Sequence, residues 1–255
     1  MLDKTLLKKL LPTVSVITKE TTVSTNNDAK LLINDIKHDT LITAEEQTGG
    51  RGRQGKSFLS PIGGLYMTLL LKCSLPITSA VCATSCSAVA AARAIKKLCG
   101  IDCGIKWVND IYADGRKLCG ILTEAVNDYD KMTTEYIIIG IGINVLSSPE
   151  MTDSTVQSVS LSELGANVSR ELLCAEIANE LIFMRDCGFD FSRYYSEYTS
   201  LSVILGHEIS FTQNGVTKNG IACGFDESGG LIVDCDEQKL HLSSGEISVR
   251  LKKTN

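Results

Sequence analysis

The sequence is poor in histidine and has no excess of positive charge. Its 255 residues include 25 lysines and arginines against 30 aspartates and glutamates, which leaves a net charge of -5. A general nucleic-acid binder needs a basic face that neutralises many phosphates, so nucleic acid is not expected as a partner. The three histidines, His38, His207 and His241, are scattered, and no Ser/His/Asp arrangement indicates nucleophilic catalysis.

The ten cysteines lack the spacing of a metal site or of a redox pair. No CxxC pair occurs, and neither the pair Cys82 and Cys86 nor the pair Cys99 and Cys103 has a histidine nearby. No secretory signal opens the chain. The cysteines are therefore expected to be reduced thiols that act as small buried apolar groups, in a cytoplasmic protein.

A run without any charged residue extends from Cys73 to Ala92 and is long enough to suggest a membrane helix. Serines and threonines are interspersed through it, and large aliphatic side chains are few. Alanine, serine and cysteine, followed by Lys96, Lys97 and Gly100, are more typical of a helix packed closely on a sheet. No association with a membrane is expected.

The pattern of apolar residues predicts a mixed sheet with helices, in an α+β or α/β-like domain. Strand-like runs occur at Thr40–Ala44, Leu65–Lys72, Ile105–Val108, Leu118–Val126 and Tyr136–Val145. Helices are predicted up to about Leu11, after Ser24, over Arg170–Met184 and near Phe189–Tyr198. The apolar residues of the helix after Ser24 are Ala29, Leu31, Leu32 and Ile36, and those on one side of the third helix are Leu172, Leu173, Ile177, Leu181 and Met184. Polar residues from Ser147 to Ser160 predict a loop.

Beyond Leu201 the pattern changes to short alternating strands separated by turn signals such as Asn214-Gly215 and Gly229-Gly230. About fifty residues of this kind predict a small β-barrel. We therefore divide the chain into a domain of residues 1–200 and a second domain of residues 201–255.

The segment from Thr43 to Gly55, TAEEQTGGRGRQG, places two arginines and four glycines within seven residues after a strand-like run. Glycine lets the backbone approach a ligand, and guanidinium groups bind phosphate or carboxylate with two parallel hydrogen bonds. Glycine-arginine runs also occur in disordered nucleic-acid-binding tails. Because the segment Thr43–Gly55 lies inside a chain of globular composition, an anion-binding loop is favoured over such a tail.

Two further clusters are ambiguous when each is taken alone. Lys106-Trp107-Val108-Asn109-Asp110 reads first as a polar turn between strands, because Asn-Asp is common there. The run from Ile138 to Val145, IIGIGINV, is apolar with Gly140 and Gly142 interrupting it, which suggests that a ligand or another backbone packs closely against the strand.

Taken together and in order, these motifs over nearly the whole chain resemble the biotin protein ligases, which attach biotin to the carrier domains of carboxylases such as acetyl-CoA carboxylase. The matching motifs are STN at Ser24–Asn26, GGRGRQG at Gly49–Gly55, KWVND at Lys106–Asp110, RKLCGIL at Arg116–Leu122, GIGIN at Gly140–Asn144 and GEISVR at Gly245–Arg250. The resemblance implies a fold like that of class II aminoacyl-tRNA synthetases with a C-terminal Src-homology-3-like barrel. Too few residues precede Ser24 for the DNA-binding domain of some members.

The resemblance also implies a set of site residues. Biotin would be bound by Ser24, Thr25, Asn26, Gln47, Gly50, Arg51, Gly52, Arg53, Lys117 and Gly120. ATP would be bound by Arg51, Arg53, Lys106, Trp107, Asn109, Asp110 and Asn144. Lys117, Arg51 and Arg53 would be the catalytic residues, and Asp110 would be a ligand of Mg²⁺ or lie next to one.

The implied reaction joins biotin and ATP to biotinyl-5'-AMP and then transfers biotin to a lysine of a biotin carboxyl carrier domain. The alternatives are lipoate or octanoate transfer on the same fold and a non-catalytic biotin sensor, and a homodimer is possible. Two residues depart from the family pattern: Val108 replaces a usual proline and Phe58 a common tryptophan. The glycine-rich loop is expected to be mobile until a ligand orders it, because fixing seven residues costs about 10 kcal/mol.

Overall fold

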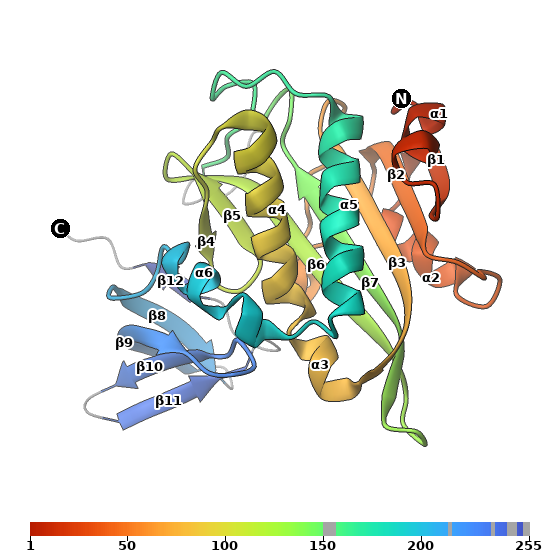
Figure 1. Ribbon diagram of the computed structural model, residues 1–255. Coiled ribbons are helices and arrows are strands. Elements are labelled where there is room, and N and C mark those ends of the chain that lie inside the picture. The colour runs from red at the N-terminus through yellow and green to blue at the C-terminus, as the bar shows by residue number, and fades with distance from the viewer. Residues whose placement is uncertain (150–156, 214–215, 236–237, 244–248, 252–255) are drawn as a thin grey trace.

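A seven-stranded mixed sheet forms the centre of the structure, a computed structural model that describes residues 1–149, 157–213, 216–235, 238–243 and 249–251 (Figure 1). Its strand order is β1-β2-β3-β7-β6-β5-β4, in which β1 and β2 are parallel and every other pair is antiparallel. The predicted mixed sheet is confirmed. The strands are β1 (Ser15–Thr22), β2 (Thr40–Gln47), β3 (Leu65–Pro76), β4 (Gly104–Lys106), β5 (Asp110–Ala113), β6 (Arg116–Asp128) and β7 (Thr133–Ile143).

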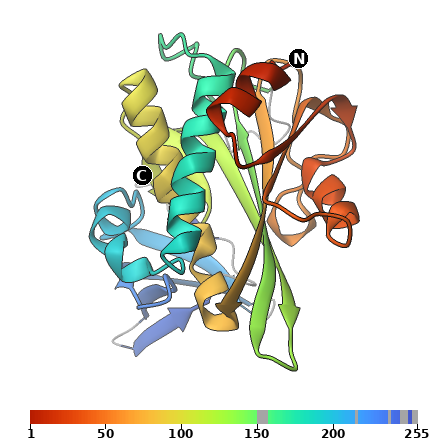
Figure 2. The same cartoon turned by 45° about the vertical axis from the view of Figure 1, so that its right-hand side comes forward.

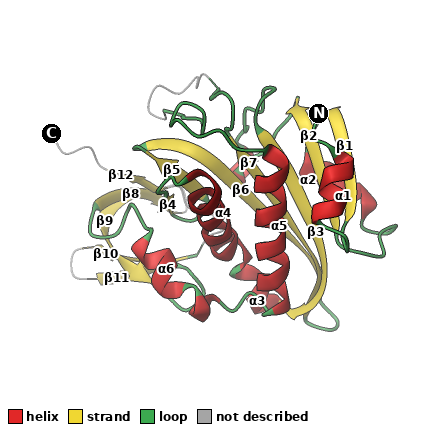
Figure 3. Cartoon of the chain, turned by 45° about the horizontal axis from the view of Figure 1, so that its top comes forward, coloured by secondary structure: helices red, strands yellow, loops and turns green. Residues whose placement is uncertain are grey.

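Helices cover the two faces of this sheet unequally. They are α1 (Lys4–Leu10), α2 (Thr25–Leu32), α3 (Ile77–Val81), α4 (Ala83–Cys99), α5 (Arg170–Asp186) and α6 (Tyr195–Ser200), with short 3-10 turns η1 (Arg53–Gly55) and η2 (Phe191–Arg193). Helices α4 and α5 lie side by side on one face, whereas α2 packs on the other face (Figure 3). No helix within the described ranges is long and apolar enough to cross a membrane.

The uncharged run identified in the sequence covers the end of β3, all of α3 and the first part of α4. Within α4 its alanines, serines and Cys86 are buried against the sheet, as expected, because small side chains let the helix axis approach closely. The helix ends at Gly100, which has φ 71°, a left-handed conformation that glycine adopts without a steric penalty.

Strand β7 presents different residues to the two faces of the sheet. Ile137, Ile139, Ile141 and Ile143 belong to the large core under α4 and α5. Because successive side chains of a strand point to opposite faces, Gly140 and Gly142 lie on the α2 face. Ile138, also on that face, joins a small apolar cluster with Ala29, Ile42 and Leu70. The α2 face is therefore apolar at Ile138 and without side chains at the two glycines.

The C-terminal strands form a separate five-stranded antiparallel sheet in the order β11-β10-β9-β8-β12, below and beside the large sheet (Figure 2). They are β8 (Glu208–Gln213), β9 (Val216–Phe225), β10 (Leu231–Cys235), β11 (Gln238–Leu242) and β12 (Val249–Leu251). The predicted all-β character of this part is confirmed. The domain boundary at residue 200 and closure into a barrel stay predictions, and residues 245–248 of the GEISVR motif lie outside the described ranges.

Several expectations about individual elements were wrong. Strands β1 and β5 were not predicted, and the helix after Ser24 ends at Leu32, so Ile36 packs from outside it. Leu31 and Leu172 are 79% and 45% exposed, so these two residues were wrongly assigned to the buried faces of α2 and α5. The other predicted residues of the α5 face, Leu173, Ile177, Leu181 and Met184, are buried.

All ten cysteines are free thiols, and Cys82, Cys86, Cys103, Cys119 and Cys174 are buried. Burial raises the pKa of Cys103 to about 12, because the thiolate loses its hydration there. No group of three or more His, Cys, Asp or Glu side chains that could hold a metal occurs among the described residues.

Candidate active site

Polar side chains at the start of α2 form one connected cluster with β2 and β3. Gln47 Oε1 accepts hydrogen bonds from the backbone N of Thr25 at 2.9 Å and from its Oγ1 at 3.1 Å. Thr68 Oγ1 lies 2.8 Å from Thr25 Oγ1 and 2.7 Å from Asn26 Oδ1. Ser24 occupies the N-cap position of α2, but its hydroxyl caps no backbone N-H. The cluster thus contains Thr25, Asn26 and Gln47, three of the residues that the resemblance assigns to biotin, and Ser24 precedes it in the chain.

Gly140 makes room for this cluster. A Cβ added at Gly140 would lie 2.0 Å from Asn26 Oδ1, far inside van der Waals contact. Asn26 is also held from the other end, because its Nδ2 donates to Leu122 O and to Glu124 Oε2, each at 3.2 Å. The glycine in the middle of an isoleucine-rich strand therefore serves the placement of Asn26.

The glycine-arginine loop begins where β2 ends and is tied back to the cluster. Gly50 O accepts from Phe58 N at 2.8 Å, and Gln47 Nε2 donates to Ser60 Oγ at 2.8 Å. Between these anchors the chain makes the η1 turn, with φ 55° at Gln54. Gln47 thus contacts both the start of α2 and the far end of the loop.

The ring of Phe58 covers two glycines that are opposite each other on β6 and β7. Gly120 pairs with Gly142, and a Cβ on either one would lie 2.8 Å or 2.3 Å from the Phe58 ring. Lys117 Nζ lies 5.9 Å from the centre of the same ring. The aromatic residue that departs from the family pattern is therefore at the centre of the candidate site.

Arg53 and the KWVND motif meet beside this ring. Arg53 Nη1 donates to Asn109 Oδ1 at 3.3 Å, and Nη2 is buried without a hydrogen-bond partner among the described residues. Burial lowers the pKa of Arg53, while the Asp110 carboxylate opposes that shift. Asp110 Oδ1 lies 2.8 Å from Lys117 Nζ. Two cations and one carboxylate thus lie together, and one buried N-H group of Arg53 has no acceptor among the described residues.

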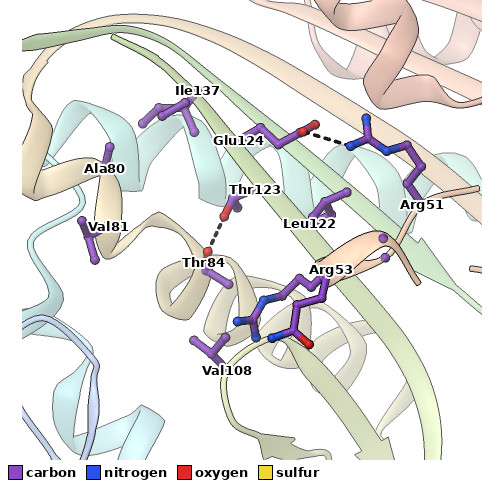
Figure 4. Close-up of a pocket in the computed structure, with 14 residues that line it drawn as sticks. Arg51, Arg53, Ala80, Val81, Thr84, Val108, Leu122, Thr123, Glu124 and Ile137 are labelled. Atoms are coloured by element: carbon purple, nitrogen blue, oxygen red, sulfur yellow. Dashed lines mark hydrogen bonds and ion pairs between the residues drawn. The ribbon is translucent and has the colours of Figure 1, made fainter. Parts of the chain in front are cut away.

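Arg51 does not join this group. Its Nη1 donates to Asn27 Oδ1 at 2.8 Å, and its Nη2 lies 3.5 Å from Glu124 Oε1. Arg51 and Arg53 leave the loop in different directions, toward Glu124 and toward Val108 (Figure 4). Both line an open cavity of about 380 Å³ whose walls come from the loop, from α3 and α4, and from β6. This volume is within the usual range for small-molecule sites.

The remaining residues expected to contact ATP have protein partners in this structure. Trp107 Nε1 donates to Gly229 O at 2.9 Å, which connects the KWVND motif to the C-terminal sheet. Asn144 Nδ2 donates to Val159 O at 3.0 Å and to Lys117 O at 3.4 Å. Lys106 Nζ lies 5.6 Å from the ring centre of Tyr112. Of these side chains, Asn144 holds the backbone beside Lys117. Contacts of all three with a nucleotide stay predictions.

Sequence reasoning missed Thr68, Ser60 and Glu124. Each comes from a strand or loop that was identified only for its apolar residues or its glycines. Thr68 pairs with Gly140 in the β3–β7 register, so only knowledge of the register places it beside Asn26. Knowledge of which strands pair, and in which register, would have been needed to identify these residues.

Comparisons with known proteins identify the family of the chain. Residues 15–144 match the model of the biotin/lipoate A/B protein ligase family, and residues 204–250 match that of the biotin protein ligase C-terminal domain. The chain is 30% identical over 234 residues to the bifunctional ligase/repressor BirA of Bacillus subtilis, covering 86% of this chain and 69% of that protein. It is also 30% identical over 226 residues to the biotin–[acetyl-CoA-carboxylase] ligase of Paracoccus denitrificans, covering 83% and 91%.

Among solved structures, a biotin protein ligase from Aquifex aeolicus in complex with biotin and ATP superposes with a TM-score of 0.75 at 25% identity. The match covers 93% of this chain and 99% of that one.

Proposed function

The chain belongs to the biotin/lipoate A/B protein ligase family as a biotin protein ligase, an ATP-dependent enzyme, and from this premise we propose its reaction. Biotin and ATP react to biotinyl-5'-AMP and pyrophosphate, and the biotinyl group is then transferred to a lysine of a biotin carboxyl carrier domain. The observation that carries the proposal is the meeting of Arg53, Asp110 and Lys117 beside a hydrogen-bonding cluster at the start of α2.

The cluster of Thr25, Asn26 and Gln47 suits the ureido ring of biotin. This ring offers N-H donors and a carbonyl acceptor, and hydroxyl and amide groups match both. The two glycines on β6 and β7, with the Phe58 ring over them, would give the bicycle and tail an apolar surface. A ligand without matching polar groups would leave buried atoms unpaired at about 1 to 3 kcal/mol each, so selectivity should come from this end.

The cationic group suits the other end of biotin and the nucleotide. In the first step a carboxylate oxygen of biotin attacks the α-phosphorus of ATP, and the bond to pyrophosphate breaks. The two anions repel each other, so Arg53 and Lys117 would bring them together by neutralising charge, with Arg51 turning in from the loop. The Nη2 of Arg53, which has no partner within the described ranges, would donate to an anionic oxygen.

In the second step the amine of the carrier lysine attacks the carbonyl carbon of the adenylate, and AMP leaves. Lys117 would donate to the carbonyl oxygen as it gains negative charge. No side chain of the enzyme needs to form a covalent bond. The loop from Gly49 to Ser60 would exclude water from the adenylate while the carrier approaches.

Asp110 is the proposed contact for the Mg²⁺ that accompanies ATP. Lys117 contacts its Oδ1, so the other oxygen of this carboxylate would contact the ion. One carboxylate fits Mg²⁺ in nucleotide sites, where phosphates and water supply the other ligands. When bound, the ion neutralises phosphate charge.

A transfer assay tests the function directly. The full chain is incubated with ATP, magnesium and a biotin carrier domain, with biotin and lipoate offered in parallel, and the mass of the carrier is measured. A mass increase with biotin alone supports the proposal. Transfer of lipoate would favour the transferase alternative, and biotin binding without transfer would favour a sensor.

A further inference from the structure

We propose that Glu124 on β6 is a positioning residue that couples biotin binding at Asn26 to the placement of Arg51 in the glycine-arginine loop. The inference deepens the proposed function and rests on it. It assigns a role to a carboxylate that none of the sequence motifs identified.

Glu124 has contacts with three different parts of the site. Its Oε2 accepts from Asn26 Nδ2 at 3.2 Å, and its Oε1 accepts from Lys30 Nζ at 2.6 Å. The same Oε1 lies 3.5 Å from Arg51 Nη2, the contact drawn as a dashed line in Figure 4. One carboxylate thus connects the ring-binding cluster, helix α2 and the loop.

The position of Glu124 in the sheet makes a purely structural role a poor explanation. In the β6–β7 register it is opposite Ile138, and Leu122 is opposite Gly140 on the same face. An apolar residue would extend the cluster around Ile138 without the cost of desolvating a charge. Instead, the side chain is only 22% exposed, and its carboxylate is met by groups from α2 and the loop.

The geometry also explains how the coupling works. Lys30 holds Oε1 at a much shorter distance than Arg51 does, so Arg51 can leave without stranding the carboxylate. A ligand that hydrogen-bonds to Asn26 shifts its side-chain amide. Because this amide donates to Glu124 Oε2, the carboxylate moves with it. Arg51, also held by Asn27, is then released toward an anionic ligand.

Limited trypsin digestion measures the state of the loop, because trypsin cleaves after Arg51 and Arg53. The wild-type chain, Glu124→Gln and Lys30→Met are digested with and without biotin, and biotin affinity is measured by calorimetry. Glu135→Gln, the same change on the adjacent strand and 49% exposed, is the matched control. It should behave as wild type.

We expect biotin to slow cleavage of the wild-type loop by about fivefold or more, the usual lower range of coupling between sites. Glu124→Gln should still bind biotin, but its loop should be cleaved faster than that of wild type in the absence of biotin, because Arg51 loses the carboxylate that holds it. Lys30→Met should have the opposite effect on the free enzyme: with its competitor removed, Arg51 binds Glu124 more closely and cleavage without biotin becomes slower than in wild type. A structural role would predict faster cleavage for both variants.

Two results would overturn the inference while leaving the proposed function intact. One is cleavage of the Glu124→Gln loop at the wild-type rate in the absence of biotin. The other is faster cleavage in Lys30→Met, which remains decisive if Glu124→Gln fails to fold. If wild-type protein binds no biotin at all, the proposed function itself is wrong, and the inference falls with it.

Discussion

Gly140→Ala tests the site more sharply than removal of a charged residue, because the substitution adds a single methyl group. The added Cβ would lie 2.0 Å from Asn26 Oδ1, 2.8 Å from its Cγ and 3.0 Å from its Nδ2. Asn26 is 4% exposed and its neighbours are strands of the sheet, so the whole amide must move out of place. The backbone of β7 needs no change, since Gly140 lies within the strand and its φ is not positive.

The magnitude follows from the hydrogen bonds that Asn26 would lose. Its amide contacts Thr68 Oγ1 at 2.7 Å, and Leu122 O and Glu124 Oε2 at 3.2 Å each. At about 1 kcal/mol each, their loss lowers the free energy of unfolding by roughly 2 to 4 kcal/mol, with some desolvated groups left unpaired. Biotin affinity should fall by about tenfold or more, since about 1.4 kcal/mol of lost hydrogen bonding corresponds to a factor of ten.

Urea unfolding measures the first quantity, and titration calorimetry with biotin measures the second. Gly224→Ala in β9 is the control, because a Cβ there would meet nothing within 4 Å and the strand would tolerate it. If Gly140→Ala binds biotin as tightly as wild type, Asn26 has no part in the pocket, and the assignment of the ring-binding cluster is refuted.

Three further outcomes are expected. Arg51→Ala should release biotinyl-adenylate into solution, because the loop loses an anion contact that closes it over the intermediate. Chromatography of the reaction mixture measures the free adenylate, and the same amount from Arg51→Ala as from wild type would contradict this prediction. Trp107→Phe should lower the free energy of unfolding by about 1 to 3 kcal/mol in urea, because Gly229 O loses its buried donor, whereas unchanged stability would contradict that contact. Cys223, the exposed thiol, should react first with Ellman's reagent, and buried Cys119 and Cys174 only after unfolding; early reaction of the buried pair would contradict the core packing.

The element types of the large sheet were predictable where local chemistry decides them. The small residues of α4, with Gly100 after its last turn, indicate a close-packed helix in any context, because that composition suits few other environments. The hairpin of β6 and β7 was predictable from two apolar runs. In contrast, β1 escaped prediction because its polar residues form a strand only when β2 lies beside it.

The candidate site divides in the same way. Residue types and their order were enough to predict an anion-binding loop, because glycine and arginine act there through their own backbone freedom and charge, and the motifs together were enough to indicate the family. The biotin-binding residues came only from that resemblance. Which side chains meet depended on strand register and on the packing of α2. These placed Arg53 with Asp110 and Lys117, sent Arg51 to Glu124, and set Thr68 beside Asn26. Such contacts join residues far apart in the chain, and only the folded sheet brings them within hydrogen-bonding distance.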